Sequence, residues 1–130
     1  MRYFVSGHRD ITFDEFFDNY VPLLDKVRAE DSNAEFIVGD WEGCDMLTLE
    51  YLLCDLFPYP NITIYGVDKI RINPYGLTPD KYPTVNIVLK TSYDECDASM
   101  TTDSDFDIAW IKPGKEDSHT AKNIKRRFNL

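Results

Sequence analysis

The sequence predicts a doubly wound α/β fold of the Rossmann-like type, with a mainly parallel sheet and helices on both of its faces. Short apolar runs alternate with helical patterns along the chain, which is the order expected of repeated strand–helix units. Three of these runs stop at polar loops that carry Gly7, Gly39 and Gly114. In an open parallel sheet such loops emerge at the carboxyl edge, so we expect the three loops to lie together there.

Residues 1–130 are predicted to form a single domain. No internal repeat or low-complexity segment divides the chain, and its apolar fraction of 43% is typical of a packed globular domain. This length leaves no room for a second domain of comparable size. We therefore expect any larger site to be shared between the subunits of a homo-oligomer.

The charge of the chain disfavours several classes of partner. With 23 acidic and 14 basic side chains the formal net charge is −9, and this field opposes non-specific binding to nucleic acids or anionic membranes. No apolar run approaches the ~18 residues of a membrane-spanning helix. The N-terminus opens directly into a strand pattern and shows no signal-peptide pattern. We expect a cytoplasmic protein with no membrane partner.

The cysteines and histidines do not indicate a metal or redox site. Cys44, Cys54 and Cys96 match neither zinc-binding nor redox spacing, so reduced thiols are expected. His8 and His119 lie in separate loops, and no cluster of His, Cys and Asp has the spacing of metal ligands. We predict neither a metal nor a cofactor.

The first strand is expected over residues 2–6, followed by a helix packed on the sheet. Thr12 and Glu15 form a T-x-x-E capping box at the start of that helix. Pro22 lies inside the helical pattern, where it removes an N–H donor and clashes with the preceding turn, so we expect a kink or a restart near Tyr20. The residues that recur at helical spacing and are expected in the core are Phe13, Phe16, Phe17, Tyr20, Leu24 and Val27.

The middle of the chain predicts two further strands around one helix. Strands are expected over 36–39 and 62–65, because both runs are short, apolar and followed by glycine. Leucines cover more than one side of the helix expected over 45–56, so this helix should be nearly buried. From 67 to 83 prolines interrupt every pattern, and an irregular excursion is expected.

The last third predicts a strand, a helix, a strand and a final helix. The strands are expected over 85–89 and 107–111, with a helix over 92–102 between them. The final helix begins near Ser118 and carries three cations at 125–127. Cations in a last turn complement the helix dipole, so this cluster requires no nucleic acid to explain it.

The polar loops carry groups suited to a phosphate-bearing ligand. Ser118 and Thr120 can cap a helix or donate to a phosphate oxygen. His8 and Arg9 directly follow the first strand and can supply cationic donors in an otherwise acidic protein. The alternative is that these are ordinary connections, since every α/β protein has loops at this edge. A nucleotide-type ligand is our leading hypothesis.

Two aspartates flank the second loop. Asp40 and Asp45 lie on either side of Gly43, where each can accept hydrogen bonds from ribose hydroxyls. Each can equally cap the helix that follows. The sequence leaves both interpretations open.

Several short motifs together resemble a known superfamily. They are residues 5–9 (Val-Ser-Gly-His-Arg), 38–40 (Val-Gly-Asp) with Gly43 and Asp45, 100–105 (Met-Thr-Thr-Asp-Ser-Asp), 108–109 (Ile-Ala), 113–114 (Pro-Gly) and 118–120 (Ser-His-Thr). This set resembles the Rossmann-like SLOG superfamily, which includes LOG-type nucleotide phosphoribohydrolases, DNA-processing SMF proteins and small nucleotide-sensing proteins. It is also similar to the nucleoside 2-deoxyribosyltransferases, which place an Asp-Ser-Gly-Thr-like turn after an Asp-bearing strand.

One departure from these families affects catalysis. In the LOG-type and deoxyribosyltransferase patterns, a Gly-Thr turn is followed three residues later by a Glu that acts at the ribose. Here the turn is Ser118-His119-Thr120 and the later position is Asn123. A neutral amide can orient a hydroxyl or a water but cannot act as a carboxylate nucleophile or general base.

The leading hypothesis is therefore binding of a nucleotide or nucleotide-derived small molecule at the carboxyl edge of the sheet. The alternative is an N-glycosidic bond hydrolase, or a deoxyribosyl or ribosyl transferase, acting on nucleosides or their monophosphates, with Asp45 and Asp105 as the candidate catalytic carboxylates. A third interpretation is a purely structural or interaction protein. The predicted ligand-binding residues are Gly7, His8, Arg9, Gly39, Asp40, Gly43, Asp103, Gly114, Ser118, His119, Thr120 and Asn123.

Overall fold

The computed structural model describes residues 1–54, 59–71 and 82–128. In these residues five strands form one sheet in the order β4-β3-β2-β1-β5, and every neighbouring pair is parallel. The predicted α/β class and parallel sheet are thereby confirmed. The strands are β1 (Arg2–Ser6), β2 (Glu35–Val38), β3 (Asn61–Val67), β4 (Val85–Lys90) and β5 (Phe106–Ala109).

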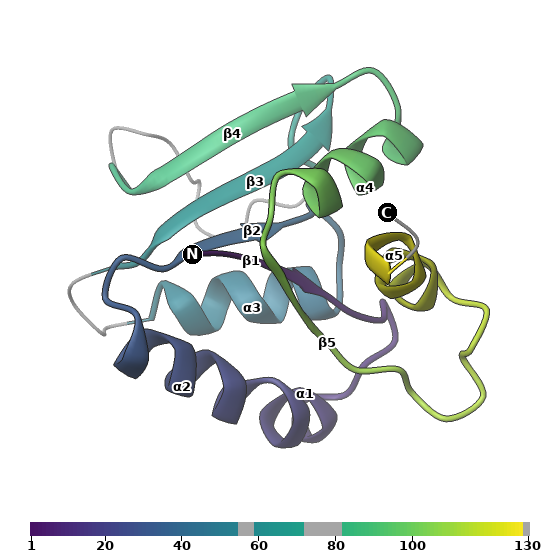
Figure 1. Ribbon diagram of the computed structural model, residues 1–130, viewed down its shortest axis with the longest axis horizontal. Coiled ribbons are helices and arrows are strands. Elements are labelled where there is room, and N and C mark those ends of the chain that lie inside the picture. The colour runs from purple at the N-terminus through teal and green to yellow at the C-terminus, as the bar shows by residue number, and fades with distance from the viewer. Residues whose placement is uncertain (55–58, 72–81, 129–130) are drawn as a thin grey trace.

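Helices cover both faces of the sheet, as predicted (Figure 1). One face carries α1 (Phe13–Asn19), α2 (Val21–Glu30) and α3 (Cys44–Leu52), and the other carries α4 (Tyr93–Thr102) and α5 (His119–Phe128). The strand order proceeds from β1 to β4 in one direction, whereas β5 pairs with the other side of β1. This reversal makes a topological switch point between β1 and β5, where their loops lead to helices on opposite faces.

The predicted break in the first helix is confirmed at Tyr20. The amide of Glu15 donates to Thr12 Oγ1 at 3.1 Å and the amide of Thr12 donates to Glu15 Oε1 at 2.9 Å, which completes the capping box of α1. Tyr20 ends α1 and precedes α2, and Pro22 lies in the first turn of α2. A proline costs little there because the first helical N–H groups have no intrahelical partner.

The aromatic stripe of this region is only partly in the core. Phe16 and Tyr20 are buried and stack on each other, with ring centroids 5.4 Å apart. Phe13 and Phe17 were also expected in the core but are 66% and 53% exposed, and they pack mainly on each other. The restart at Tyr20 leaves α1 only seven residues long, and this short helix packs mainly on α2 and α3, so Phe16 is its one buried side chain.

Side chains along each strand point alternately to the two faces of the sheet, and a hydrophobic core lies on each face. Val5 packs with the α1–α3 side, whereas Phe4 packs with Met100 of α4 on the opposite side. Successive side chains of a strand point to opposite faces, so Ser6 shares the α4–α5 side with Phe4. Position 6 is therefore the last residue of β1 directed toward that side.

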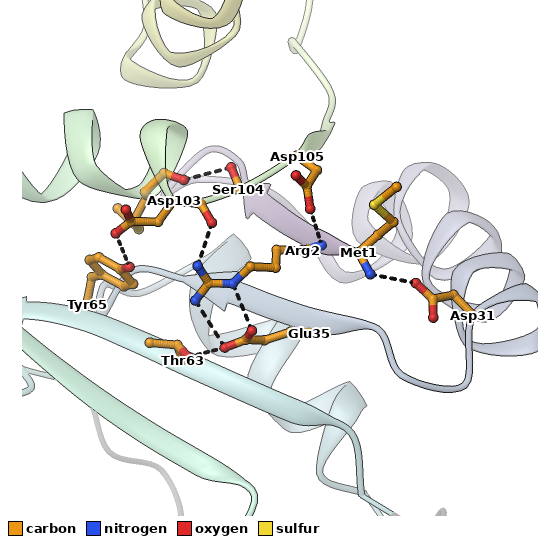
Figure 2. A network of polar contacts seen from close by, with 10 residues as sticks. Met1, Arg2, Asp31, Glu35, Thr63, Tyr65, Asp103, Ser104 and Asp105 are labelled. Atoms are coloured by element: carbon orange, nitrogen blue, oxygen red, sulfur yellow. Dashed lines mark hydrogen bonds and ion pairs between the residues drawn. The ribbon is translucent and has the colours of Figure 1, made fainter.

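The amino edge of the sheet is held by a polar network around Arg2 (Figure 2). Its guanidinium donates to Glu35 Oε2 and to the Asp103 carbonyl oxygen, both at 2.8 Å, and this bond from Arg2 lowers the pKa of Glu35. Thr63 Oγ1 donates to the same carboxylate at 2.8 Å, and the amide of Arg2 donates to Asp105 Oδ2 at 2.8 Å. The network joins strands β1, β2 and β3 to the segment before β5.

In the part of the chain that the structure describes, no helix is long and apolar enough to cross a membrane.

Candidate ligand-binding site

An open cleft of about 1140 Å³ lies at the carboxyl edge of the sheet, on the side covered by α4 and α5. Its walls are the loops after β1, β2 and β5, the segment after β3, one side of α4 and the first two turns of α5. The three glycine-bearing loops thus share one edge, as the sequence predicted. The predicted site residues that line the cleft are Gly7, His8, Arg9, Gly39, Asp40, Asp45, Gly114, Ser118, His119, Thr120 and Asn123.

Three predicted site residues lie outside the lining of this cleft. Asp103 and Asp105 precede β5 and therefore lie at the amino edge, where both interact with Arg2 (Figure 2). Asp105 is thus removed from the catalytic candidates by its position. Gly43 begins α3 with φ +82°, and a Cβ there would be 2.3 Å from the Arg9 carbonyl oxygen. Glycine at position 43 therefore allows the backbone at the start of α3 to lie close to the backbone at Arg9.

Three small polar side chains in the lining of the cleft are almost fully buried. Ser6, Thr120 and Asn123 are each more than nine-tenths buried and line it. Ser6 Oγ has no hydrogen-bond partner among the described residues, whereas Asn123 Oδ1 accepts from Arg126 Nη1 at 2.6 Å. Unpaired polar atoms are uncommon in protein interiors, so Ser6 offers a hydrogen bond to a ligand or a water.

The amino end of α5 contributes part of this polar lining. Ser118 Oγ accepts from the Ala121 amide at 3.2 Å, so Ser118 caps the helix, one of its two predicted roles. Ser118, His119 and Thr120 all line the cleft. Because the first N–H groups of a helix have no intrahelical partner, this end offers donors and a partial positive charge to a ligand.

His8 joins two loops and does not supply a cation. It is 5% exposed, and its Nε2 accepts the Lys112 amide N–H at 2.8 Å. Burial lowers the pKa of His8, the charges of Lys112 and Lys115 lower it further, and Asp10 opposes them. The expectation of a cationic donor at His8 is therefore wrong. The neutral ring fixes the loop after β1 to the loop after β5 at the switch point.

Asp40 forms a buried ion pair at one end of the cleft. It is 2% exposed and accepts from Arg71 through the backbone amide at 2.9 Å, Nε at 3.1 Å and Nη2 at 2.8 Å. The Arg71 guanidinium lies 3.9 Å from the ring centres of both Trp41 and Tyr93. Both oxygens of the Asp40 carboxylate thus bind Arg71. Asp40 does not cap a helix, and it is already paired where it lines the cleft.

Asp45 is a half-buried carboxyl with an altered titration. It is enclosed by protein on most sides and open toward the cleft, and its Oδ2 accepts the Trp41 amide at 3.1 Å. A Cβ at Gly39 would be 2.7 Å from the same oxygen, so the glycine makes room for it. Burial raises the pKa of Asp45 to about 7, with smaller contributions from Asp40 and Asp97. Gly43 occupies the N-cap of α3, so the capping role is not taken by Asp45.

Asp97 of α4 and His119 of α5 lie next to each other in the lining of the cleft. Asp97 Oδ2 is 3.6 Å from Nδ1 of His119, whose side chain is largely exposed. Burial raises the pKa of Asp97, and His119 and Arg126 oppose that change. The pair places a second carboxyl with a raised pKa on the same cleft as Asp45.

The cleft is predominantly acidic. Its cations are already paired, Arg9 with Glu42, Arg71 with Asp40 and Lys115 with Asp10. Acidic side chains outnumber basic ones among the described residues that line it. The acids are Asp10, Asp40, Glu42, Asp45, Asp97 and Asp117, and the cations are Arg9, Arg71 and Lys115. This balance disfavours a ligand with several phosphates.

Sequence reasoning missed several residues of this cleft, among them Trp41, Arg71, Tyr93 and Asp97. Trp41 lies inside the predicted glycine loop and is half-buried, and a tryptophan beside loop glycines is a usable signal for a binding surface. Arg71 gave no such signal, because it lies in the irregular segment after β3. In the described residues, no group of three metal-ligating side chains lies close enough to hold an ion.

Comparison with protein-family models, curated proteins and solved structures found no match to this chain. The resemblance to the SLOG superfamily and to the deoxyribosyltransferases remains a prediction from the motifs.

Proposed function

We propose that the cleft binds a nucleoside or a related nucleotide-derived small molecule. The observation that carries this proposal is the position of the cleft, which lies at the carboxyl edge beside the β1–β5 switch point and receives the amino end of α5. Open α/β sheets bind ligands at such points. A volume of about 1140 Å³ is slightly above that of most small-molecule sites, which commonly span roughly 300–1,000 Å³, so the cleft has room for a nucleoside.

The lining favours a ligand with many hydroxyl and N–H donors. Carboxyls such as Asp45 and Asp97 accept hydrogen bonds from a sugar, while Ser6, Thr120 and Asn123 offer neutral partners. Each additional phosphate brings charge toward an acidic surface whose cations are already paired. The amino end of α5 is the one place described above that suits a single phosphate. We therefore rank nucleosides and monophosphates above triphosphates.

Thermal unfolding with added ligand tests this proposal. A nucleoside that binds only the folded state stabilises it by about 1.4 kcal/mol for each tenfold excess over its dissociation constant. Adenosine, guanosine, cytidine and uridine should be compared with the corresponding mono- and triphosphates. No shift with any of them at millimolar concentration would count decisively against the proposal.

A pair of variants locates the binding. Thr120→Val preserves side-chain volume and removes a buried hydroxyl from the cleft, so it should weaken binding by about 0.5–1.5 kcal/mol, or roughly two- to tenfold. Lys26→Ala, on the exposed side of α2, is the matched control and should leave affinity unchanged. Equal affinity in Thr120→Val and the parent protein would place the ligand elsewhere.

One observation favours a second candidate function, cleavage or exchange of an N-glycosidic bond. A carboxyl whose pKa is about 7 holds its proton in a large fraction of molecules at neutral pH, so Asp45 can act as a general acid toward a departing base. An ionised Asp97 can stabilise the positive charge that develops on the sugar. Asn123 supplies no nucleophile, which favours attack by water on the sugar carbon over a covalent intermediate, and the proton released by that water returns to the Asp45 carboxylate.

Release of free base from a nucleoside, followed by chromatography, tests the second candidate. Asp45→Asn removes the acidic proton with little change in shape and should abolish release while ligand binding is retained. Nucleoside binding without any release of base by the parent protein would leave binding as the sole proposed function.

A further inference from the structure

We propose that Trp41 is the platform on which the base of the ligand stacks, with Arg71 as its fixed support and Arg9 as a cover that the base displaces. This inference rests on the proposed binding of a nucleoside in the cleft, and it assigns the part of the site that holds the base. All three residues line the cleft.

Arg71 is held in place on several sides. Its guanidinium lies 3.9 Å from the ring centres of both Trp41 and Tyr93, and it pairs with Asp40, which is only 2% exposed. Moving Arg71 away would leave a buried carboxylate without its partner, which is strongly unfavourable. The arrangement therefore fixes the orientation of the Trp41 indole and makes it a rigid surface.

Arg9 is held much more weakly over the same indole. Its guanidinium carbon is 5.1 Å from the ring centre, and its side chain is 66% exposed. Its ion pair with Glu42 is also largely exposed to solvent. Exposed ion pairs contribute little because water and salt screen them, so a stacking ring can replace Arg9 at small cost.

Displacement of Arg9 by the base would also free the Glu42 carboxylate, which can then recognise the base. When Arg9 leaves, the Glu42 carboxylate becomes available as an acceptor beside the platform. A carboxylate accepts N–H donors, so the site favours a base with an exocyclic amino group. Purines offer the larger stacking area, which makes adenosine a suitable probe.

Substitutions of Trp41 test the platform. Trp41→Leu should weaken adenosine binding by about tenfold or more, whereas Trp41→Phe, which retains a ring, should lose less. Neither variant should alter binding of ribose 5-phosphate, which lacks a base. Adenosine binding by Trp41→Leu equal to that of the parent protein would overturn the platform and leave the proposed function standing. A parent protein that binds no nucleoside would remove both proposals.

Substitutions at the cover test the exchange. Arg9→Ala should tighten adenosine binding by about two- to fivefold, because the base no longer has to displace an ion pair. Glu42→Gln removes the same ion pair together with the carboxylate acceptor, so it should tighten binding of purine riboside, which lacks the amino group, while adenosine loses its advantage over purine riboside. Arg9→Ala that weakens adenosine would show that Arg9 contacts the ligand directly and would overturn its role as a cover. Thermal unfolding of each variant establishes that it is folded before affinities are compared.

Discussion

Replacement of Asp45 by Asn should change how the stability of the protein depends on pH. Burial raises the pKa of this carboxyl from 3.8 to about 7, so the folded protein retains a proton that the unfolded chain has already released. Between about pH 4 and about pH 7 the folded state therefore binds more protons, and the free energy of unfolding falls as pH rises. The stability conferred by the protonated form is fully present below about pH 4 and is lost by about pH 7. Asp45→Asn cannot titrate and should lack this component.

The size of the effect follows from the shift. A difference of about three pKa units corresponds to at most about 4 kcal/mol, at 1.36 kcal/mol per unit. Asp45 opens onto a solvent-accessible cleft, and Arg71 and the Trp41 amide stabilise its charged form. The effect of these partners is already contained in the pKa of about 7, but solvent in the cleft reduces the cost of ionisation further, so we expect about 1–2 kcal/mol.

Urea unfolding at about pH 5 and about pH 8 measures this difference. From the lower to the higher pH, Asp45→Asn should gain about 1–2 kcal/mol in stability relative to the parent protein. The titration of His8 is present in both proteins and largely cancels in the comparison. Asp18→Asn, on the exposed side of α1, is the matched control and should track the parent. Identical pH profiles for the parent and Asp45→Asn would refute a raised pKa at this position.

Two further predictions concern the loops around the cleft. Gly43→Ala should cost about 2–3 kcal/mol, because φ is +82° and the new Cβ would meet the Arg9 carbonyl oxygen. Gly114→Ala, with φ +86° but nothing within 4 Å of the new Cβ, should cost about 1 kcal/mol in the same urea assay. Equal losses of stability in the two variants would contradict the close approach of the backbone at Gly43 to the backbone at Arg9. The pKa of His8, measured by NMR, should lie below its ordinary value of about 6.5. The unfolded chain therefore takes up a proton first, and the free energy of unfolding should decline as the pH falls through about 6.5. An ordinary His8 titration would show that the bond from the Lys112 amide is not maintained.

The fold was largely predictable because it depends on local patterns. The alternation of short apolar runs with helical spacing specifies strands and helices without tertiary information. The capping box at Thr12 and the proline at position 22 similarly act within one or two turns, so the restart at Tyr20 could be located. Burial of Phe13 and Phe17 depended on which side of α1 packs against α2 and α3, which the local pattern does not determine.

The candidate site was predictable only where strand direction determines position. Residues that follow β1 and β2 must lie at the carboxyl edge, whereas Asp103 and Asp105 precede β5 and must lie at the opposite edge. The motif resemblance placed all of these residues in one site, whereas the strand order and direction place them at opposite edges of the sheet. Arg71 could not be found, because its place depends on Asp40 and on the stacking rings that meet only in the folded chain.

The pairing of β1 with β5 has a consequence for the order of folding. The bond between the amide of Arg2 and Asp105 joins residues 103 positions apart, and the cleft takes one wall from α5. Contacts between such distant residues form late because closing a long loop costs conformational entropy. A partly folded chain can thus contain β1, β2 and β3 and still lack half of the cleft. Acquisition of ligand binding would then report completion of the whole domain, at the moment when the last helix docks.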